Sequence, residues 1–197
     1  MDFSRITAAL TERGYRVSVF RTKEEAADYL DSTIDKTTVG FGGSVTLSEM
    51  KIADRLEKHN EIVSHWRTPG AETVRRAMTT AVYLSSVNAI SENGEIVNID
   101  GTCNRVSSIM YGHERVILVV GNNKITPDYD SAVYRARNVA APKNAQRLGR
   151  KTPCAATADR CYDCKSPERI CKALAVLWQS PGKQITEIVL VDEPLGY

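Results

Sequence analysis

Short apolar runs alternate along the chain with longer segments whose apolar residues recur at helical spacing. Residues 81–124 show this best, with three runs of strand-like length and apolar content at 81–85, 95–99 and 115–120. Asn93-Gly94 lies between the first two runs and favours a hairpin, because both residues tolerate positive φ. A helix-like segment at 104–111 precedes the third run.

The same alternation continues on both sides of this stretch. We expect strands at 15–20, 37–41 and 61–66, and helices at 2–13 and from Thr22, Thr46, Pro69, Pro127 and Pro142 onward. Thr22 and Thr46 begin capping boxes, whereas Pro69 and Pro127 each follow a threonine that can serve as N-cap. This order predicts an α/β fold, a three-layer α/β/α sandwich with a mostly parallel sheet. We expect an α/β domain over residues 1–150, a small cysteine-rich segment over 151–173, and C-terminal strands over 174–197 that complete the domain.

Polar residues collect at the ends of the predicted elements in the central stretch. In open α/β sheets, ligands bind beyond the carboxyl ends of the strands. We therefore expect one pocket lined by Asn88, Asn98, Asp100, Thr102, Asn104, Arg105, Asn122, Asn123 and Lys124. The alternative is that the Asn and Asp residues only form turns.

A glycine-rich turn follows the strand expected at 37–41. Gly42, Gly43 and Ser44 stand directly before the helix expected from Thr46. Backbone N–H groups in such a turn, together with the start of a helix, can bind a carboxylate or a phosphate. The turn lacks the third glycine of a dinucleotide fingerprint and the Gly-Lys-Ser/Thr ending of a P-loop. A glycine-rich turn without any ligand is an equal alternative.

Composition and charge narrow the class of protein. A chain of 197 residues suits one domain and can bury enough surface to fold without disulfides. The net charge is +2 with acids and bases interspersed, which argues against a nucleic-acid partner. No apolar run is long enough to span a bilayer and no signal-peptide core is present, so we expect a cytoplasmic protein. Its cysteines are then thiols or metal ligands, since disulfides rarely persist in the cytosol.

Four of the five cysteines lie within eighteen residues, in the spacing C-x6-C-x2-C-x6-C: Cys154, Cys161, Cys164 and Cys171. Thiolates bind zinc or iron–sulfur clusters in sets of four. One C-x2-C unit with a lone cysteine on each side favours a [4Fe-4S] cluster, with a zinc ion or four free thiols as the alternatives. Ser166-Pro167 is expected to start a helical turn that brings Cys171 back to the others. Cys103 stands apart and is expected to be a small buried side chain.

These motifs together make the chain resemble the LUD-domain family, the lactate-utilisation proteins, in the branch with a C-terminal four-cysteine motif. The segments that carry the resemblance are 42–47, 88–90, 94–102, 104–106, 121–125, 141–145 and 151–171. One departure is Cys103, which stands where the family's Gly-Thr-Gly-Asn-Arg motif has a glycine. The resemblance implies a fold similar to the phosphosugar isomerases and CoA transferases. It also implies an association with the oxidation of lactate to pyruvate, beside iron–sulfur partner proteins.

Two functions are open on this basis. In the first, the chain is a catalytic or electron-transfer component that acts on a small hydroxy or keto acid, or on a phosphorylated ligand. Gly42, Gly43, Ser44 and Lys124 would hold the carboxylate or phosphate, Asp100 would be the acid/base, and the ligand would be oriented by Asn88, Asn98, Thr102, Asn104 and Asn122. In the second, the chain is a non-catalytic accessory or ligand-sensing subunit with a structural zinc site. The oligomeric state is open, a homodimer being one arrangement.

Overall fold

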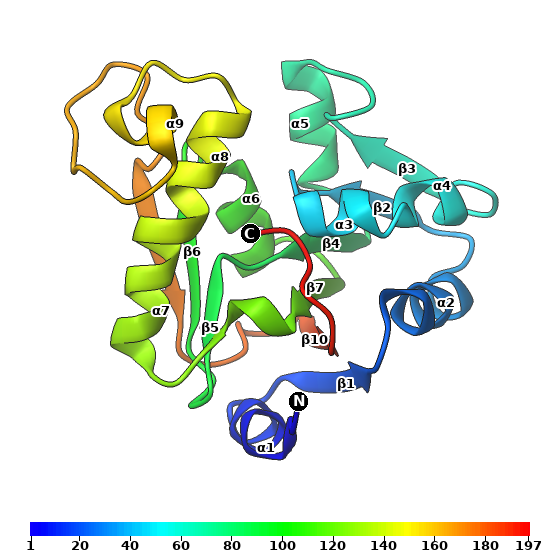
Figure 1. Cartoon of the computed structure of the whole chain (residues 1–197). Coiled ribbons are helices and arrows are strands. Elements are labelled where there is room, and N and C mark those ends of the chain that lie inside the picture. Colours follow the sequence, from blue (N-terminus) through cyan, green and yellow to red (C-terminus); the bar gives the residue numbers. More distant parts are fainter.

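A six-stranded parallel sheet forms the centre of the molecule. The computed structural model describes residues 1–197, and its sheet has the strand order β1-β10-β7-β4-β2-β3 with every neighbouring pair parallel (Figure 1). Its strands are β1 (Arg16–Phe20), β2 (Thr38–Phe41), β3 (Glu61–Ser64), β4 (Val82–Ser86), β7 (Arg115–Gly121) and β10 (Ile185–Val191). The inner strands β4, β7 and β10 are almost wholly inaccessible to solvent, as is typical of a parallel sheet that is covered on both faces. The predicted α/β class is confirmed.

Helices cover both faces of this sheet. One face packs against α2 (Lys23–Thr33), α3 (Val45–Glu49) and α4 (Ile52–Leu56) in a core of 17 buried residues. The other face packs against α1 (Ser4–Glu12), α5 (Ala71–Ala77) and α6 (Asn104–Met110), and most of its apolar side chains belong to a second core of 15 buried residues. These two cores explain why the predicted strands read as nearly continuous apolar runs.

A second sheet of four strands was not predicted from the sequence. It has the order β8-β5-β6-β9, formed by β8 (Ile125–Thr126), β5 (Ala89–Ser91), β6 (Ile96–Asp100) and β9 (Ala173–Leu177). The Asn93-Gly94 turn does make a hairpin, but it joins β5 to β6, because the chain leaves the main sheet after β4. One face of this sheet contributes to the second core, and the other packs against α7 (Tyr129–Arg135) and the π-helical turn η2 (Ala136–Ala140). The second sheet and α7 therefore add a layer to the expected sandwich.

Three helices begin at residues other than those expected. The hydroxyl of Ser44, not that of Thr46, caps α3 by accepting the Leu47 N–H at 3.3 Å. The Asp128 carboxylate caps α7 by accepting the Ser131 N–H at 2.7 Å, while the expected cap Thr126 lies in β8. Gly70 rather than Thr68 precedes α5. In each case the residue two positions away has the backbone conformation or hydrogen-bonding group that the helix start uses.

The cysteine-rich segment lies over the end of the long α7–η2–α8 helical run, in which α8 spans Ala141–Arg147 (Figure 1). It contains the short helix α9 (Pro153–Thr157), and the helical turn expected from Ser166-Pro167 is only a hydrogen-bonded turn. After this segment the chain returns to the body of the molecule, where β9 pairs with β6 and β10 lies between β1 and β7. None of the helices is both long enough and apolar enough to cross a lipid bilayer.

Candidate functional site

Buried polar side chains gather where β4 and β7 end and where the turn after β2 passes. We call this group, made by Thr46, Ser86, Arg105, Lys124 and Arg135, the polar edge. Lys124 follows β7 in a short 3-10 turn (η1, Asn122–Lys124), and it is only 3% exposed. Its Nζ donates to the Thr46 hydroxyl at 2.8 Å and to the Ser86 hydroxyl at 2.9 Å. The structure thus brings Lys124 to the edge where the strands end, with two hydroxyl partners that were not predicted as site residues.

Arg105 cross-links the elements around this edge. One terminal nitrogen donates to the Ser86 carbonyl at 3.0 Å and to Asn98 Oδ1 at 2.6 Å. The other donates to Asn88 Oδ1 at 3.2 Å and to the Ile99 carbonyl at 2.8 Å. Asn88 and Asn98, predicted to orient a ligand, therefore orient a buried guanidinium group in this structure. These bonds tie the end of β4 to β6 and to the start of α6.

Positive charge exceeds negative charge at the polar edge. Arg135 reaches it from α7 and donates to the backbone carbonyls of Asn123 and Asn88. The carboxylate nearest to Arg105 is that of Asp100, with its Oδ2 3.8 Å from Arg105 Nε. Burial, and then the nearby charges of Arg135 and Arg105, lower the pKa of Lys124 to about 7, whereas Glu49 acts in the opposite direction. The arrangement favours a small anion, which would offset this charge.

The glycine-rich turn closes against the polar edge on the side of β2. A Cβ atom at Gly42 would lie 2.9 Å from the Tyr83 hydroxyl and 3.1 Å from Arg105 Cγ, so only glycine fits without a shift. At Gly43 a Cβ would lie 2.9 Å from Trp66 Nε1. The turn is therefore packed against side chains. The following helix α3 has only five residues, which leaves little dipole for an anion.

Other predicted site residues have local roles in the structure. Asp100 accepts the backbone N–H groups of Thr102, Cys103 and Val106 at 3.0–3.2 Å, and so holds the start of α6. Thr102 and Asn104 bond to each other at 2.6 Å, and Asn122 donates to Asp192 at 3.0 Å. An acid/base role for Asp100 stays a prediction. Ser86 comes at the end of a strand and Thr46 follows the glycine-rich turn, so both could have been predicted as site residues from the sequence. Nothing in the sequence around Arg135 indicates that it reaches this site.

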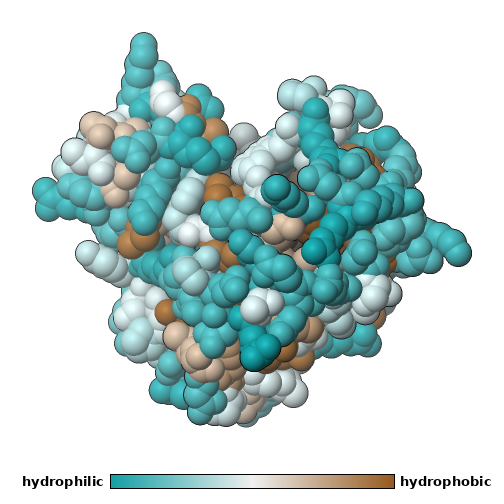
Figure 2. Space-filling view, turned by 45° about the vertical axis from the view of Figure 1, so that its right-hand side comes forward, coloured by the Kyte–Doolittle hydropathy of each residue, from teal (hydrophilic) through white to brown (hydrophobic).

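The last residues of the chain cover the polar edge. We call Pro194–Tyr197 the strap. The Leu195 carbonyl accepts from the Thr46 hydroxyl at 3.2 Å, and the Gly196 N–H donates to Glu49 at 2.8 Å. A Cβ at Gly196 would lie 3.4 Å from Lys124 Nζ. Figure 1 shows this end of the chain running between α8 and α3. Figure 2 shows a notch at the top of the molecule between two lobes. One lobe corresponds to the α8–α9 side of Figure 1 and the other to the α5 side, and the outer surface of both lobes is largely hydrophilic.

All four clustered cysteines line a single cavity, which is also lined by Arg137, Arg169 and apolar residues of α8. The Asp163 N–H donates to Cys161 Sγ at 3.3 Å, and Arg137 approaches the same sulfur at 3.9 Å. Negative charge on the neighbouring Cys171 sulfur raises the pKa of the Arg169 guanidinium above its usual value. No three His, Cys, Asp or Glu side chains are placed so that they could hold a metal ion. The donor set and its N–H and arginine neighbours suit a thiolate centre, but the sulfurs do not converge on one point.

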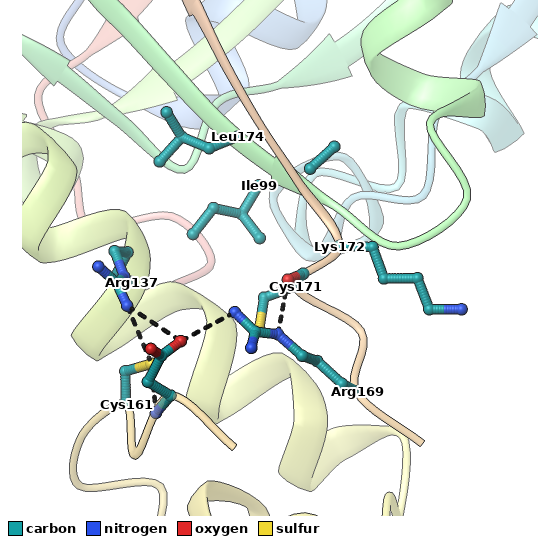
Figure 3. Close-up of a pocket in the computed structure, with 9 residues that line it drawn as sticks. Ile99, Arg137, Cys161, Arg169, Cys171, Lys172 and Leu174 are labelled. Atoms are coloured by element: carbon teal, nitrogen blue, oxygen red, sulfur yellow. Dashed lines mark hydrogen bonds and ion pairs between the residues drawn. The ribbon is translucent and has the colours of Figure 1, made fainter. Parts of the chain in front are cut away.

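A second cavity of about 350 Å³ adjoins the cysteines (Figure 3). Cys161, Cys171, Arg137 and Arg169 lie on one side of it, and Ile99 and Leu174 of the second sheet form its apolar side. Asp163 accepts from Arg169 at 3.2 Å and lies 3.5 Å from Arg137, so it holds both arginines at the mouth. The ion pair between Arg137 and Asp163 thereby joins the cysteine segment to η2.

Both the sequence and the fold of the chain are similar to those of known proteins. The sequence matches the family described as LUD domain over residues 3–191, and no curated protein matches it. A solved structure of a DUF162 family protein from Deinococcus radiodurans is similar, with a TM-score of 0.52, 12% identity, and coverage of 96% of this chain and 99% of that chain. Ribose 5 phosphate isomerase A from Neisseria gonorrhoeae reaches a TM-score of 0.35 with 16% identity over 53% of each chain. eIF2B beta from Chaetomium thermophilum reaches 0.34 with 13% identity over 66% of this chain and 44% of that chain.

The identity to the Deinococcus radiodurans protein is low, so this likeness supports the fold alone. The other two scores are too low to support an argument. The sequence match extends over nearly all of the 197 residues. On that ground the chain belongs to the LUD-domain family.

Proposed function

We propose that the protein binds a small anionic ligand, a hydroxy or keto acid or a phosphorylated compound, at the polar edge. The observation that carries this proposal is the excess of basic groups, since three of them, Arg105, Lys124 and Arg135, gather at an edge where two carboxylates, Asp100 and Glu49, act on them. Burying charge without a counter-charge is costly, and a bound anion would remove that cost. Arg105 donates to four acceptors of the protein itself, so Lys124 and Arg135 are the groups with capacity for a ligand.

A thermal-shift experiment tests the ligand class. Lactate and inorganic phosphate are added separately at increasing concentration, and a ligand that binds only the native state raises the melting temperature. We expect a concentration-dependent rise with at least one of them, and loss of that rise in Lys124→Met. The matched control is Lys183→Met, which removes an exposed lysine of the loop before β10. Melting temperatures that do not respond to any small carboxylate or phosphate would refute the proposal.

We further propose that Cys154, Cys161, Cys164 and Cys171 bind a [4Fe-4S] cluster. The four thiolates of such a cluster bind four separate iron atoms, so they need not converge on one point as the ligands of a zinc ion do. Backbone and arginine N–H groups near Cys161 would stabilise thiolate charge. The cluster would supply one-electron transfer, consistent with a role in oxidation of lactate or a related acid beside iron–sulfur partner proteins.

Metal analysis of protein purified without oxygen tests the cysteine site. We expect brown protein whose broad visible absorption bleaches on reduction, and colourless protein for Cys161→Ser. Cys103→Ser is the matched control, because Cys103 lies outside the cysteine cavity. Colourless wild-type protein with one zinc per chain would favour the alternative, a non-catalytic accessory or ligand-sensing subunit with a structural metal.

A further inference from the structure

Lys124 has a hydrogen-bonding environment that suits an uncharged amine. The Thr46 hydroxyl donates its hydrogen to the Leu195 carbonyl at 3.2 Å, and the Ser86 hydroxyl donates to the Val119 carbonyl at 2.6 Å. Each hydroxyl has one hydrogen, so both oxygens can only accept from Lys124 Nζ. A neutral amine has two N–H donors and one lone pair, and the two hydroxyls match the two donors. The lone pair is then left free on the side of Nζ that faces neither hydroxyl.

An ammonium group would fit the same position poorly. It has three N–H donors and no acceptor, and the only side chains bonded to Nζ are the two hydroxyls. The charged groups that face it are Arg105, Arg135 and Glu49, and the two guanidinium groups repel a third cation. The position is 3% exposed, so little water can solvate the third donor. The lowered pKa described above follows from this same geometry.

We propose that Lys124 is a nucleophilic amine, which condenses through Nζ with the carbonyl carbon of a small keto acid or aldehyde acid to form an imine. The inference rests on the proposed anion site and deepens it, since Arg135 would hold the carboxylate of the same molecule. In the reaction the Nζ lone pair forms the new C–N bond and the carbonyl π electrons move to oxygen. The two amine hydrogens leave with that oxygen as water, and a C=N bond remains. The step requires neither an oxidant nor a reductant.

The strap must move before a ligand can reach Nζ. Gly196 lies over the amine, and its backbone is held by Glu49 through its N–H at 2.8 Å and by Asn123 through its carbonyl at 3.1 Å. The Tyr197 hydroxyl accepts from Arg147 at 2.9 Å and adds a third attachment. The contacts of Gly196 and Tyr197 are hydrogen bonds at the surface or near it, so these two residues can move aside while Leu195 stays in the first core.

Reductive trapping tests the proposal. The full chain is incubated with pyruvate and sodium cyanoborohydride near neutral pH, and the modified residue is found by peptide mass mapping. We expect one reduced adduct on Lys124, formed on the order of 100-fold faster than on exposed lysines, whose neutral fraction at this pH is about 0.001 or less. The rate should rise with pH and reach half its maximum near the pKa of about 7.

Two variants separate a nucleophile from a simple cation. Lys124→Arg places a permanent cation at this position and Lys124→Met keeps the length without an amine, and we expect both to lose the adduct while Lys183→Met retains it. Circular dichroism melting checks that each variant is folded. If pyruvate raises the melting temperature of the wild type but gives no adduct, the imine is overturned and the anion site stands. If pyruvate gives neither effect and lactate and phosphate give no shift, the anion site fails as well. Adducts on exposed lysines with Lys124 unmodified would also overturn the proposal.

Discussion

Among single residues, the two basic side chains at the centre of the polar edge differ in what their neighbours leave for a ligand. Arg105 donates to Ser86 of β4, to Asn88 in the connection that follows, and to Asn98 and Ile99 of β6, and so holds the edge together. Lys124 donates to two hydroxyls whose own hydrogens are directed to backbone carbonyls. The terminal donors of the Arg105 guanidinium group are all used within the protein, so this group stabilises the structure. The Lys124 amine keeps a free lone pair, so it can react with a ligand.

Cys103 is a residue whose backbone conformation can be tested directly. It lies at φ 64° in the left-handed region, directly before α6. A residue with a Cβ atom loses about 1–2 kcal/mol of stability in this conformation. Glycine avoids this loss, but its greater freedom in the unfolded chain destabilises the folded state by about 0.5–1 kcal/mol. We therefore expect Cys103→Gly to raise the free energy of unfolding by about 1 kcal/mol in urea denaturation. Cys103→Ala keeps the unfavourable φ and should gain nothing, so equal stability of the two variants would contradict this account.

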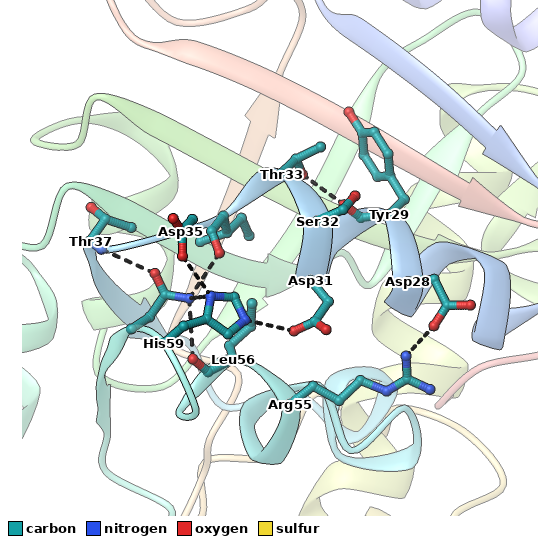
Figure 4. Close-up of polar contacts among 12 residues, drawn as sticks. Asp28, Tyr29, Asp31, Ser32, Thr33, Asp35, Thr37, Arg55, Leu56 and His59 are labelled. Atoms are coloured by element: carbon teal, nitrogen blue, oxygen red, sulfur yellow. Dashed lines mark hydrogen bonds and ion pairs between the residues drawn. The ribbon is translucent and has the colours of Figure 1, made fainter.

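At the scale of elements, His59 joins two segments on one side of the sheet. Its Nε2 lies 2.9 Å from Asp31 of α2, and its Nδ1 lies 3.1 Å from Asp35 in the loop after α2 (Figure 4). His59 itself stands between α4 and β3, and an ion pair between Arg55 and Asp28 connects the same two helices. The hydrogen bond to Asp31, supported by Asp35, raises the pKa of His59 against the opposing effect of burial.

This contact should make stability depend on pH. Because the folded pKa is raised above its ordinary value of 6.5, the contribution is complete below about pH 6.5 and is lost as pH rises through the folded pKa. We expect His59→Asn to lower the melting temperature more at about pH 6 than at about pH 9. His65→Asn is a control of opposite sign, because burial lowers the pKa of His65 and its protonation opposes folding. A His59→Asn deficit that is the same at both pH values would show that the contact is not ionic.

Elements were predictable from the sequence where a pattern is local, and not where it depends on distant partners. The strand runs at 37–41 and 115–120 are apolar because both faces of the main sheet are covered, and they were predicted within a residue. β5 has only three residues, and its pairing with β6 and β8 gives no periodic signal. Lys124 could be placed at the edge because β7 precedes it, but the strap that covers it comes from 70 residues later. The hydroxyl partners of Lys124 follow from tertiary structure for the same reason.

At the scale of the whole molecule, the last strand of the chain completes a sheet whose other strands come earlier in the sequence. β10 lies between β1 and β7, with parallel partners along most of its length. Val189 and Val191 enter one core and Ile188 and Leu190 enter the other. Both cores and the pairing of the edge strand β1 therefore include β10.

A chain that ends at Gln184 should therefore not fold cooperatively. Ile188, Val189, Leu190 and Val191 are each fully buried, and burial of each contributes about 1.5–3 kcal/mol. Together these contributions match the total stability of a typical domain, about 5–15 kcal/mol. The matched control ends at Glu193, which keeps β10 and removes only the strap. It loses the buried side chain of Leu195, at about 1.5–3 kcal/mol, but keeps both sheets. We expect cooperative thermal unfolding by circular dichroism for this control and none for the shorter chain.

Since the control also uncovers Lys124, its reaction with pyruvate and cyanoborohydride should be faster than that of the full chain. A slower reaction in a folded control would mean that the strap helps to build the site instead of covering it.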